Sequence, residues 1–564
     1  MADARVKIDQ IRNWMTSKNI DAYLVPRSDR YQGEYVTPSQ ERLKWLTNFT
    51  GSHGVVAILQ NKAALFVSGM YTLQSSMQID TDLYQIVESP PASPMEWLGK
   101  NLKRKSVIGF DPMLFTASQI ALWRKAAAKE EWVFQPIEEN AIDQFWFNKP
   151  ADPVNKAVAQ KIEFAGETTE SKVSRIVEEI SEDAHHLLIS EPSMVSWLLN
   201  MRGQDITHTP LVHSQALLDK ENQITLFVDQ QKITPDLRTA WGNHVAVEDL
   251  SNLLDVIAKI NKPLQIDPLE TPYAVKAFCD QKKISLIETS NPAIQMRAQK
   301  NKIEIDGAIK AHEIDAQAFA DFTTWFKSQD FKKESISELD IVAKLHELRK
   351  ATGQCVDDSF DTIAGYGPNG AIIHYNATEE TNLQLKENSL LLLDSGGQYH
   401  YGTTDVTRVF ALGAPTKEMK THYTAVLKGL INLSMVRFPE GTKGGQLDSL
   451  ARAPIWELGL NYAHGTGHGV GSYLSVHEWP RAAFHLQNLI PLLPGMILSI
   501  EPGIYIKGQY GIRLENLVVV IEDKRPGDVQ KMLAFKTLTK IPFENDLIDF
   551  DLMNENEKAF LKQF

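Results

Sequence analysis

Hydrophobic positions in the first third of the chain follow two alternating spacings. Apolar residues recur every three to four positions over 6–15 and 117–127, which is the spacing of an amphipathic helix. Short continuous apolar runs lie between these segments, bounded by Gly, Pro, Asn or Asp, and such runs are typical of strands. The pattern predicts a hairpin and two further strands, over residues 54–59 with 63–67, 21–25 and 106–110.

Much the same order of elements recurs after a Pro-containing stretch at 148–153. Helical spacing alternates there with strand-like runs, the helices over 172–180, 194–200 and 250–260 and the strands over 186–189, 224–228 and 263–266. A long helix over 304–326 follows, and Gly-rich turns with antiparallel-looking strands dominate beyond Asp361. We therefore predict an α/β (α+β) protein of three domains, with boundaries 1–150, 151–302 and 303–564.

Composition and charge narrow the functional classes. Hydrophobic residues make up 43% and charged residues 23% of the 564 positions, the balance of an ordinary globular protein with ample core material. The net charge of −13, without a dense Lys/Arg run, argues against a nucleic-acid partner. The two cysteines, Cys279 and Cys355, cannot provide a disulfide framework and fit a reducing compartment.

Neither a leader nor a membrane span is predicted. The N-terminal residues enter an amphipathic pattern at once and lack the apolar core of a signal peptide. The longest apolar runs, such as 390–393 and 518–521, are far shorter than the roughly 20 residues that a membrane helix needs. We expect a cytoplasmic protein with no membrane partner.

Five residues stand out because their side chains are costly in apolar surroundings. Asp394 ends an apolar run and Asp405 follows across a Gly-rich turn, so a hairpin would set these carboxylates near each other on adjacent strands. His468 lies in the sequence His-Gly-Thr-Gly-His-Gly-Val-Gly, where glycines let backbone approach closely. Glu501 and Glu515 each interrupt a later strand-like run.

These five residues predict a metal centre. Buried carboxylates without partners cost several kcal/mol or take up protons, so four carboxylates and one imidazole call for shared cations. An oxygen-rich donor set with one nitrogen suits Mn²⁺, Co²⁺ or Zn²⁺, and the missing thiolates argue against structural zinc. Two metal ions about 3.5–4 Å apart can hold a hydroxide between them as a nucleophile at neutral pH.

A structural interpretation of the same residues stays open. Each of them alone is more often a salt-bridge partner than a ligand, and together they could form a buried ion-pair network. Such a network needs basic partners, and Arg408 and Arg513 are the evident ones on the same strands. Two cations cannot balance four carboxylates, so this interpretation ranks below the metal centre.

Four further residues surround the predicted ligands in the sequence. His374, His464 and His477 cluster around the set, which favours a substrate-facing role in orienting a peptide or stabilising a tetrahedral intermediate; each could also be an ordinary core histidine. Arg513 lies two residues before Glu515 and would point to the same strand face. It is interpreted as a partner that orients a ligating carboxylate, with a plain salt bridge as the alternative.

The motifs that contain these residues resemble aminopeptidase P, and more narrowly its long three-domain cytosolic form in the pita-bread metallopeptidase family. Trp197 to Gly203 is similar to a segment of that form outside the catalytic region. Two positions depart from the family pattern: Met70 replaces a common arginine, and Trp479 a common glycine. The catalytic motifs that match are 367–375, 394–399, 402–408, 464–471, 476–478, 501–503 and 511–516.

The resemblance implies two creatinase-like α/β N-terminal domains followed by a pita-bread catalytic domain. It further implies that Asp394 holds one metal, that His468 and Glu501 hold the other, and that Asp405 and Glu515 bridge them. Glu501 would also take the proton from the bridging water, and the catalytic, substrate-positioning histidines would be His374, His464 and His477. The family commonly uses manganese, acts on peptides with proline in second position and forms homodimers.

Three other functions remain under consideration. A prolidase shares the catalytic domain and the metal set but acts on Xaa-Pro dipeptides. A methionine aminopeptidase is less favoured, because it needs no large N-terminal region. A non-catalytic pita-bread module that grips peptides would have no need of a complete ligand set, yet all five predicted ligands are present.

Overall fold

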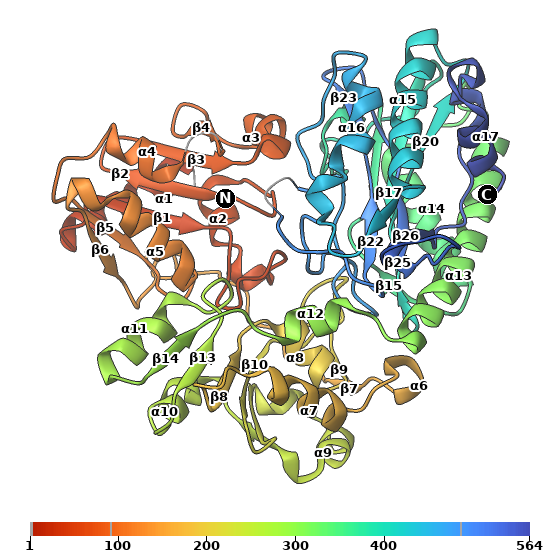
Figure 1. The fold of residues 1–564 in the computed structure, drawn as a ribbon. Helices are drawn as coiled ribbons and strands as arrows, with labels where there is room; N and C mark the ends of the chain where they lie inside the picture. Colours follow the sequence, from red (N-terminus) through yellow and green to blue (C-terminus); the bar gives the residue numbers. More distant parts are fainter. Residues whose placement is uncertain (1–3, 91–92, 486–487) are drawn as a thin grey trace. The chain divides into compact units, whose positions relative to one another are not determined.

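The computed structural model describes residues 4–90, 93–485 and 488–564 (Figure 1). The chain forms two compact units. The N-terminal unit comprises residues 1–159, 168–207 and 211–293. The C-terminal unit comprises residues 294–564 together with two short segments from earlier in the chain, 160–167 and 208–210. The three predicted domain boundaries therefore stay a prediction.

The first sheet of the N-terminal unit has six strands in the order β4-β3-β2-β1-β5-β6. β1 pairs antiparallel with β2 and parallel with β5, and apolar clusters cover both faces of the sheet, one of them including Ile8 and Ile11 of the first helix. The predicted hairpin over β2 and β3 is confirmed. The strands are β1 (Ala22–Pro26), β2 (Val55–Leu59), β3 (Ala63–Val67), β4 (Gln85–Glu88), β5 (Val107–Phe110) and β6 (Val133–Pro136).

The second sheet repeats the topology of the first. Its order is β12-β11-β10-β8-β13-β14, and β8 pairs antiparallel with β10 and parallel with β13, as β1 does with β2 and β5. The prediction of two successive domains of similar α/β design is confirmed. The strands are β8 (His186–Ile189), β10 (Ser214–Asp219), β11 (Ile224–Val228), β12 (Val245–Glu248), β13 (Leu264–Ile266) and β14 (Leu286–Glu288).

Short helices connect these strands. The helix predicted over 250–260 is shorter than expected, because a 3-10 turn at Leu250–Asn252 precedes α10 (Leu253–Ile257). A two-residue pair, β7 (Val158–Ala159) with β9 (Met201–Arg202), completes the unit. The other helices are α1 (Ala4–Ser17), α2 (Arg42–Thr47), α3 (Thr72–Gln78), α4 (Pro94–Gly99), α5 (Ala117–Ala126), α7 (Thr169–Glu179), α8 (Pro192–Leu198), α9 (Pro235–Trp241) and α11 (Tyr273–Lys282).

Antiparallel strands dominate the C-terminal unit (Figure 1). They form a sheet of order β16-β17-β20, a sheet of order β15-β18-β19, a four-stranded sheet of order β21-β26-β25-β22 and the pair β23-β24. Their bounds are β15 (Cys355–Asp358), β16 (Ile363–Tyr366), β17 (Ser389–Ser395), β18 (Gly397–Tyr399), β19 (Gly402–Thr403), β20 (Val406–Leu412), β21 (Arg437–Pro439), β22 (Ile497–Ile500), β23 (Gly503–Ile506), β24 (Tyr510–Arg513), β25 (Asn516–Glu522) and β26 (Met532–Thr537).

Helices cover these sheets. Asn301 and Glu304 form a capping box at the start of the predicted long helix, and its phenylalanines pack on Phe410 of β20, with Phe326 and Phe410 ring centroids 5.0 Å apart. The helices of the unit are α6 (Ile162–Ala165), α12 (Ala293–Ala298), α13 (Lys302–Ser328), α14 (Glu338–Ala351), α15 (Lys417–Ser434), α16 (Asp448–Trp456) and α17 (Glu555–Leu561). Among the described residues, no helix is both long enough and apolar enough to span a bilayer.

Candidate metal centre

The two aspartates lie on neighbouring strands, as the hairpin prediction required. Asp394 is on β17, where its register partner on β20 is Thr407, and Asp405 immediately precedes β20. The connection is not the simple turn that was expected, because β18 and β19 within it pair in a different sheet. A Cβ atom at Gly396 would collide with the Thr404 carbonyl oxygen, so the chain can fold back here only through a glycine.

The two glutamates lie at breaks between strands. Each was predicted to interrupt a strand-like run, and the run is indeed divided there: Glu501 follows β22 and precedes β23, and Glu515 lies between β24 and β25. At each break the chain passes from one sheet to another, and the interrupted backbone is bound by a neighbouring segment. Glu501 N donates to the Thr466 carbonyl at 2.8 Å and Glu515 N to the Thr407 carbonyl at 3.1 Å.

His468 is held in its loop by β22. His468 N donates to Ser499 Oγ at 3.0 Å, and Ser499 N donates to the His468 carbonyl at 2.8 Å. A side chain at Gly467 would collide with the Ser499 carbonyl oxygen, so a glycine is required for this close approach. His468 Nδ1 donates to the Gly469 carbonyl at 2.9 Å, which leaves Nε2 to face the carboxylates.

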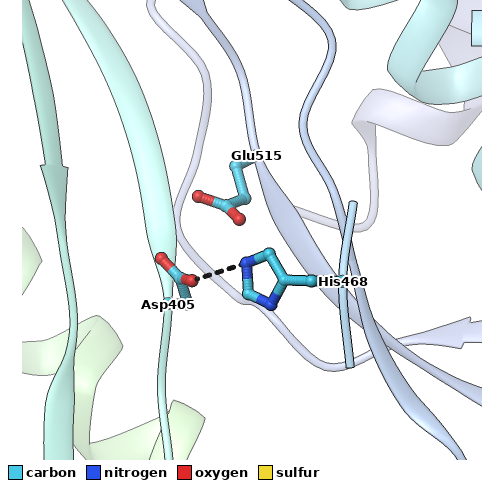
Figure 2. A group of neighbouring side chains, drawn as sticks. All are labelled: Asp405, His468 and Glu515. Carbon is cyan, nitrogen blue, oxygen red and sulfur yellow. Dashed lines mark ion pairs between the residues drawn. The ribbon is translucent and has the colours of Figure 1, made fainter. Parts of the chain in front are cut away.

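Figure 2 shows Asp405, His468 and Glu515 pointing toward one another from three separate segments. One ligand atom from each lies within 4.8 Å of the others. His468 Nε2 is 3.5 Å from Asp405 Oδ2 and 3.7 Å from Glu501 Oε1. Asp394 and Glu501 both interact electrostatically with Asp405, so the five predicted residues are neighbours, and their role as ligands stays a prediction.

The carboxylates repel one another in this buried place. Burial raises the pKa of Asp394, and Asp405 raises it further, although Arg513 opposes both. Burial also raises the pKa of Glu501 to about 7, and burial with the neighbouring carboxylates raises that of Glu515 well above its usual value. Burial alone would lower the pKa of His468, but Asp405 and Glu501 raise it to about 9. The protein's own charges therefore leave the carboxylates unbalanced.

The donor set fits divalent cations. Asp394 Oδ1 and Asp405 Oδ1 are buried and have no hydrogen-bond partner, so two oxygen atoms have lost water without gaining a donor. Cations bound between the four carboxylates and His468 Nε2 would satisfy these oxygens and remove the repulsion. The side chain of Glu501 is 19% exposed, against 5% for Asp405 and 8% for His468, so Glu501 is the donor nearest to solvent among these three.

Neither basic residue of the ion-pair alternative balances the centre. Arg513 Nη2 binds Asp394 Oδ2 at 2.6 Å, so the carboxylate that Arg513 contacts is that of Asp394, one of the five predicted ligands. Arg408 Nη1 donates to the Glu515 carbonyl at 2.6 Å, and Arg408 Nη2 to Asn516 Oδ1 at 2.8 Å. The other hydrogen bonds of Arg408 also end on backbone carbonyls, and within the described residues none reaches a carboxylate.

The three predicted substrate-facing histidines lie around the same centre. The rings of His468 and His477 meet edge to face, with centroids 4.3 Å apart. His464 Nδ1 lies 4.0 Å from Glu501 Oε2, and burial, with Arg513 next, lowers the pKa of His464 well below its usual value. His374 is half-buried and acts electrostatically on His464. Their roles toward a substrate stay predictions.

Sequence reasoning missed two polar residues of the site. Tyr505 OH accepts from Arg513 Nη1 at 2.8 Å and donates to His464 Nε2 at 2.8 Å. Thr407 Oγ1 donates to Glu515 Oε2 at 2.9 Å. Thr407 lies two residues after Asp405, and alternate residues of a strand point to the same face, so the spacing could have identified Thr407. The sequence around Tyr505 contains no comparable signal.

Comparisons with known proteins divide the chain into three matched regions. The profile of Metallopeptidase family M24 matches residues 306–522, which include all five clustered residues. Two profiles described as Creatinase/Prolidase N-terminal domain match residues 7–143 and 148–304. These matches cover the two repeated α/β sheets and then, up to the end of β25, most of the antiparallel unit.

Similar proteins extend the match to the whole chain. It is 33% identical over 583 residues to the probable Xaa-Pro aminopeptidase P of Talaromyces marneffei, covering all of this chain and 88% of that protein. The solved X-prolyl aminopeptidase of Caenorhabditis elegans, described as a cytosolic enzyme with a di-nuclear active site, is 32% identical, with a TM-score of 0.95 over all of this chain and 95% of that one. The prolidase of Pyrococcus furiosus is 25% identical, with a TM-score of 0.51 over 65% of this chain and 99% of that one.

Proposed function

The chain belongs to metallopeptidase family M24 and, within it, to the Xaa-Pro aminopeptidase P family, and on this basis we propose that it is a metal-dependent aminopeptidase. It releases the N-terminal residue from peptides with proline in second position. The observation that carries the proposal is the unbalanced group of four carboxylates and one imidazole, together with full-length similarity to enzymes of this activity.

The proposed ligands are Asp394, Asp405, His468, Glu501 and Glu515, which would hold two divalent cations. When bound, the cations supply an activated water and polarise the carbonyl of the scissile bond. Manganese is the proposed metal, since a set of four carboxylates and one imidazole suits it, with cobalt or zinc as alternatives. A di-nuclear site is stated for the C. elegans enzyme, which supports the number of ions.

The residues around the cations have separate proposed roles. Glu501 receives the proton that water loses when it adds to the carbonyl. Its side chain is more exposed than those of Asp405 and His468, and its carboxylate faces both His464 and His468. Burial and Arg513 lower the pKa of His464, so its ring is neutral and can form hydrogen bonds with a peptide. His374 and His477 bind the peptide beside it, and Arg513 orients Asp394.

An aminopeptidase is favoured over a prolidase by the extent of the similarity. The prolidase of P. furiosus matches 65% of this chain, whereas the C. elegans aminopeptidase matches all of it. A binding module without catalysis is disfavoured because it would not need the complete donor set. The C. elegans aminopeptidase is a cytosolic enzyme, which supports the proposed cytoplasmic location. The homodimer is proposed from family resemblance.

The test is cleavage of an Xaa-Pro-Xaa tripeptide and of the matching Xaa-Pro dipeptide by the purified chain. Each peptide is assayed as purified, after chelation, and after adding back Mn²⁺, Co²⁺ or Zn²⁺. We expect metal-dependent release of the first residue from the tripeptide alone. The control Glu313→Gln removes an exposed carboxylate of α13 in the same unit and should match the wild type.

Each other outcome changes the assignment. Cleavage of the dipeptide would move the chain to the prolidases. Inactivity on both peptides with every metal would exclude a peptidase of this kind and favour the binding module.

A further inference from the structure

We propose that Glu478 is a positioning residue for His477. Its buried carboxylate, held by Lys300 and Arg297, fixes the segment 475–480 against the loop that contains His468. The inference deepens the proposed function and rests on it, since His477 is the side chain through which Glu478 would act on a peptide.

The three charged side chains lie almost completely out of water. The exposed fraction is 1% for Glu478 and 2% for both Lys300 and Arg297. Lys300 Nζ binds Glu478 Oε1, and Arg297 Nε lies 3.4 Å from Glu478 Oε2. Burying ions is costly, and well-packed apolar side chains of similar size are often at least as stabilising, so the charges are interpreted as serving geometry.

Glu478 joins the two loops that contribute histidines to the site. Glu478 N donates to the Gly469 carbonyl at 2.8 Å, and Gly469 N donates to the Pro480 carbonyl at 3.0 Å. His468 directly precedes Gly469, and His477 directly precedes Glu478. The two backbone bonds therefore set the edge-to-face contact of the His468 and His477 rings, whose centroids are 4.3 Å apart.

The fit around the carboxylate leaves little space for another arrangement. A Cβ atom at Gly471 would lie 3.2 Å from Glu478 Oε2, and one at Gly469 would lie 2.6 Å from the Trp479 carbonyl oxygen. Gly469 also forms isolated bridges to both Glu478 and Leu498, so the loop lies between the segment of His477 and strand β22. A shift of Glu478 would consequently move backbone on both sides of His468.

The cations come from a segment that is itself fixed. Lys300 N donates to the Gly495 carbonyl at 3.0 Å, and Gln299 forms a bridge with Met496 just before β22. Lys300 and Arg297 therefore approach Glu478 from the stretch that precedes α13, anchored to the strand that leads to Glu501. The carboxylate of Glu478 is the point at which this stretch and the two histidine loops meet.

The test compares Glu478→Gln with the wild type on the Xaa-Pro-Xaa tripeptide. Loss of an orienting partner commonly costs about 10–100-fold in activity, and we expect kcat to fall by that factor with KM changed less than about 3-fold. In a His477→Asn background the same substitution should change kcat less than about 3-fold, because its effect passes through His477. Bound metal per chain should stay that of the wild type.

A second readout needs no catalysis. Carbethoxylation of His477, followed by mass spectrometry, should proceed at least about 3-fold faster in Glu478→Gln, because its segment is loosened. Lys300→Met, which leaves Arg297 in place, should raise the rate less. The matched control is Asp205→Asn, which neutralises another buried carboxylate–lysine pair, Asp205 with Lys232, and should leave both kcat and the labelling of His477 unchanged.

The outcomes separate the two proposals. Unchanged labelling of His477 in Glu478→Gln would overturn the positioning role. The role would also be overturned if Glu478→Gln lowered kcat by the same factor in the His477→Asn background as in the wild type. A parallel loss of bound metal would overturn it as well. Inactivity of the wild type on the tripeptide would reject the proposed function alone, and the labelling rates would still decide the role of Glu478.

Discussion

Two buried groups of charge in the C-terminal unit behave in opposite ways. In the first, Asp315 of α13 binds Arg349 of α14, with Oδ1 2.7 Å from Nε, and accepts from Tyr399 OH at 2.9 Å. Burial would raise the pKa of Asp315, but Arg349, supported by Tyr399 and His312, lowers it below its usual value. In the candidate metal centre, burial and repulsion raise the pKa values of Asp394 and Glu515 in spite of Arg513.

The difference teaches how to separate a structural ion pair from a metal site when both are buried. Asp315 and Arg349 neutralise each other; in addition, Tyr399 donates a hydrogen bond to Asp315 and Arg349 donates one to Ser395. The metal centre has more negative than positive groups and two carboxylate oxygens without donors. Balance of charge, and not burial, is the distinguishing feature.

The largest effect is expected from removing one donor of the unbalanced group. Asp405→Asn keeps the shape of the side chain but removes the charge that faces His468 and Glu515. Bound metal, measured by elemental mass spectrometry, should fall by about half or more. Tripeptide cleavage should fall at least about 100-fold, beyond the cost typical of residues that only orient ligands. Full metal content with full activity would remove Asp405 from the ligand set.

Breaking the ion pair of Asp315 and Arg349 should lower the stability of the protein and leave its metal content and activity nearly unchanged. Asp315→Asn removes the closest counter-charge of buried Arg349 and leaves only Asp358 at 4.0 Å, a loss that typically costs about 3–5 kcal/mol. The melting temperature should drop by about 10 °C, since each kcal/mol corresponds to about 2–4 °C in a domain of this size. At low temperature the metal content and kcat should stay within about 3-fold of the wild type. A loss of metal would show that the two groups of charge are not independent.

Removing the metals should make the repulsion among the carboxylates measurable as a difference in melting temperature. Glu515→Gln takes one member from a set of mutually repelling carboxylates, and the chelated variant should melt about 2–4 °C above the chelated wild type. Saturating Mn²⁺ should reverse the order, because the wild type gains more from binding. A chelated variant less stable than the chelated wild type would mean that the carboxylates are balanced by groups other than metals.

The smallest effect concerns a histidine closer to solvent, which lies between two carboxylates. His208 Nδ1 and Nε2 lie 3.2 Å and 3.1 Å from Asp357 and Asp361. Burial would lower its pKa, but these two carboxylates raise it from 6.5 to about 10. A raised folded-state pKa gives stability that is complete below about pH 6.5 and is lost as the pH rises toward about 10.

His208→Gln tests this pH dependence by thermal melting. The variant should melt about 2 °C below the wild type near pH 6, and the difference should vanish above about pH 10. The control His244→Gln changes an exposed histidine of the other unit and should melt as the wild type does at every pH. A difference that stays constant with pH would assign the loss to packing.

Much of the fold could be predicted because its signals are local. The hairpin of β2 and β3 and the long helix α13 each follow from the spacing of apolar residues within a few turns. The repeat of two α/β sheets was predicted from element order, and the two sheets have the same strand topology. Helix α10 is shorter than predicted. The strands β18 and β19 were not predicted, because strands of two or three residues carry too little apolar pattern to be recognised.

The sequence predicted which residues form the candidate site, but not which of them contact one another. Carboxylates and a histidine in apolar or Gly-rich segments identified Asp394, Asp405, His468, Glu501 and Glu515, since burying such groups is costly wherever it happens. That three of these carboxylates stand at breaks between strands, and that Arg513 binds Asp394, could not be read from spacing. Those facts depend on strand register, which joins residues 119 positions apart in the pair of Arg513 and Asp394.

The sequence by itself determined which chemical groups are present and which of them must find partners. Only the tertiary structure decided the partners, because the free energy of a buried charge depends on the atoms that surround it and not on its neighbours in the chain. Asp315 and Asp394 are both buried aspartates of one unit. Asp315 meets an arginine that neutralises it. Asp394 also binds an arginine, Arg513, but it lies among further carboxylates whose charge remains and leaves a place for cations.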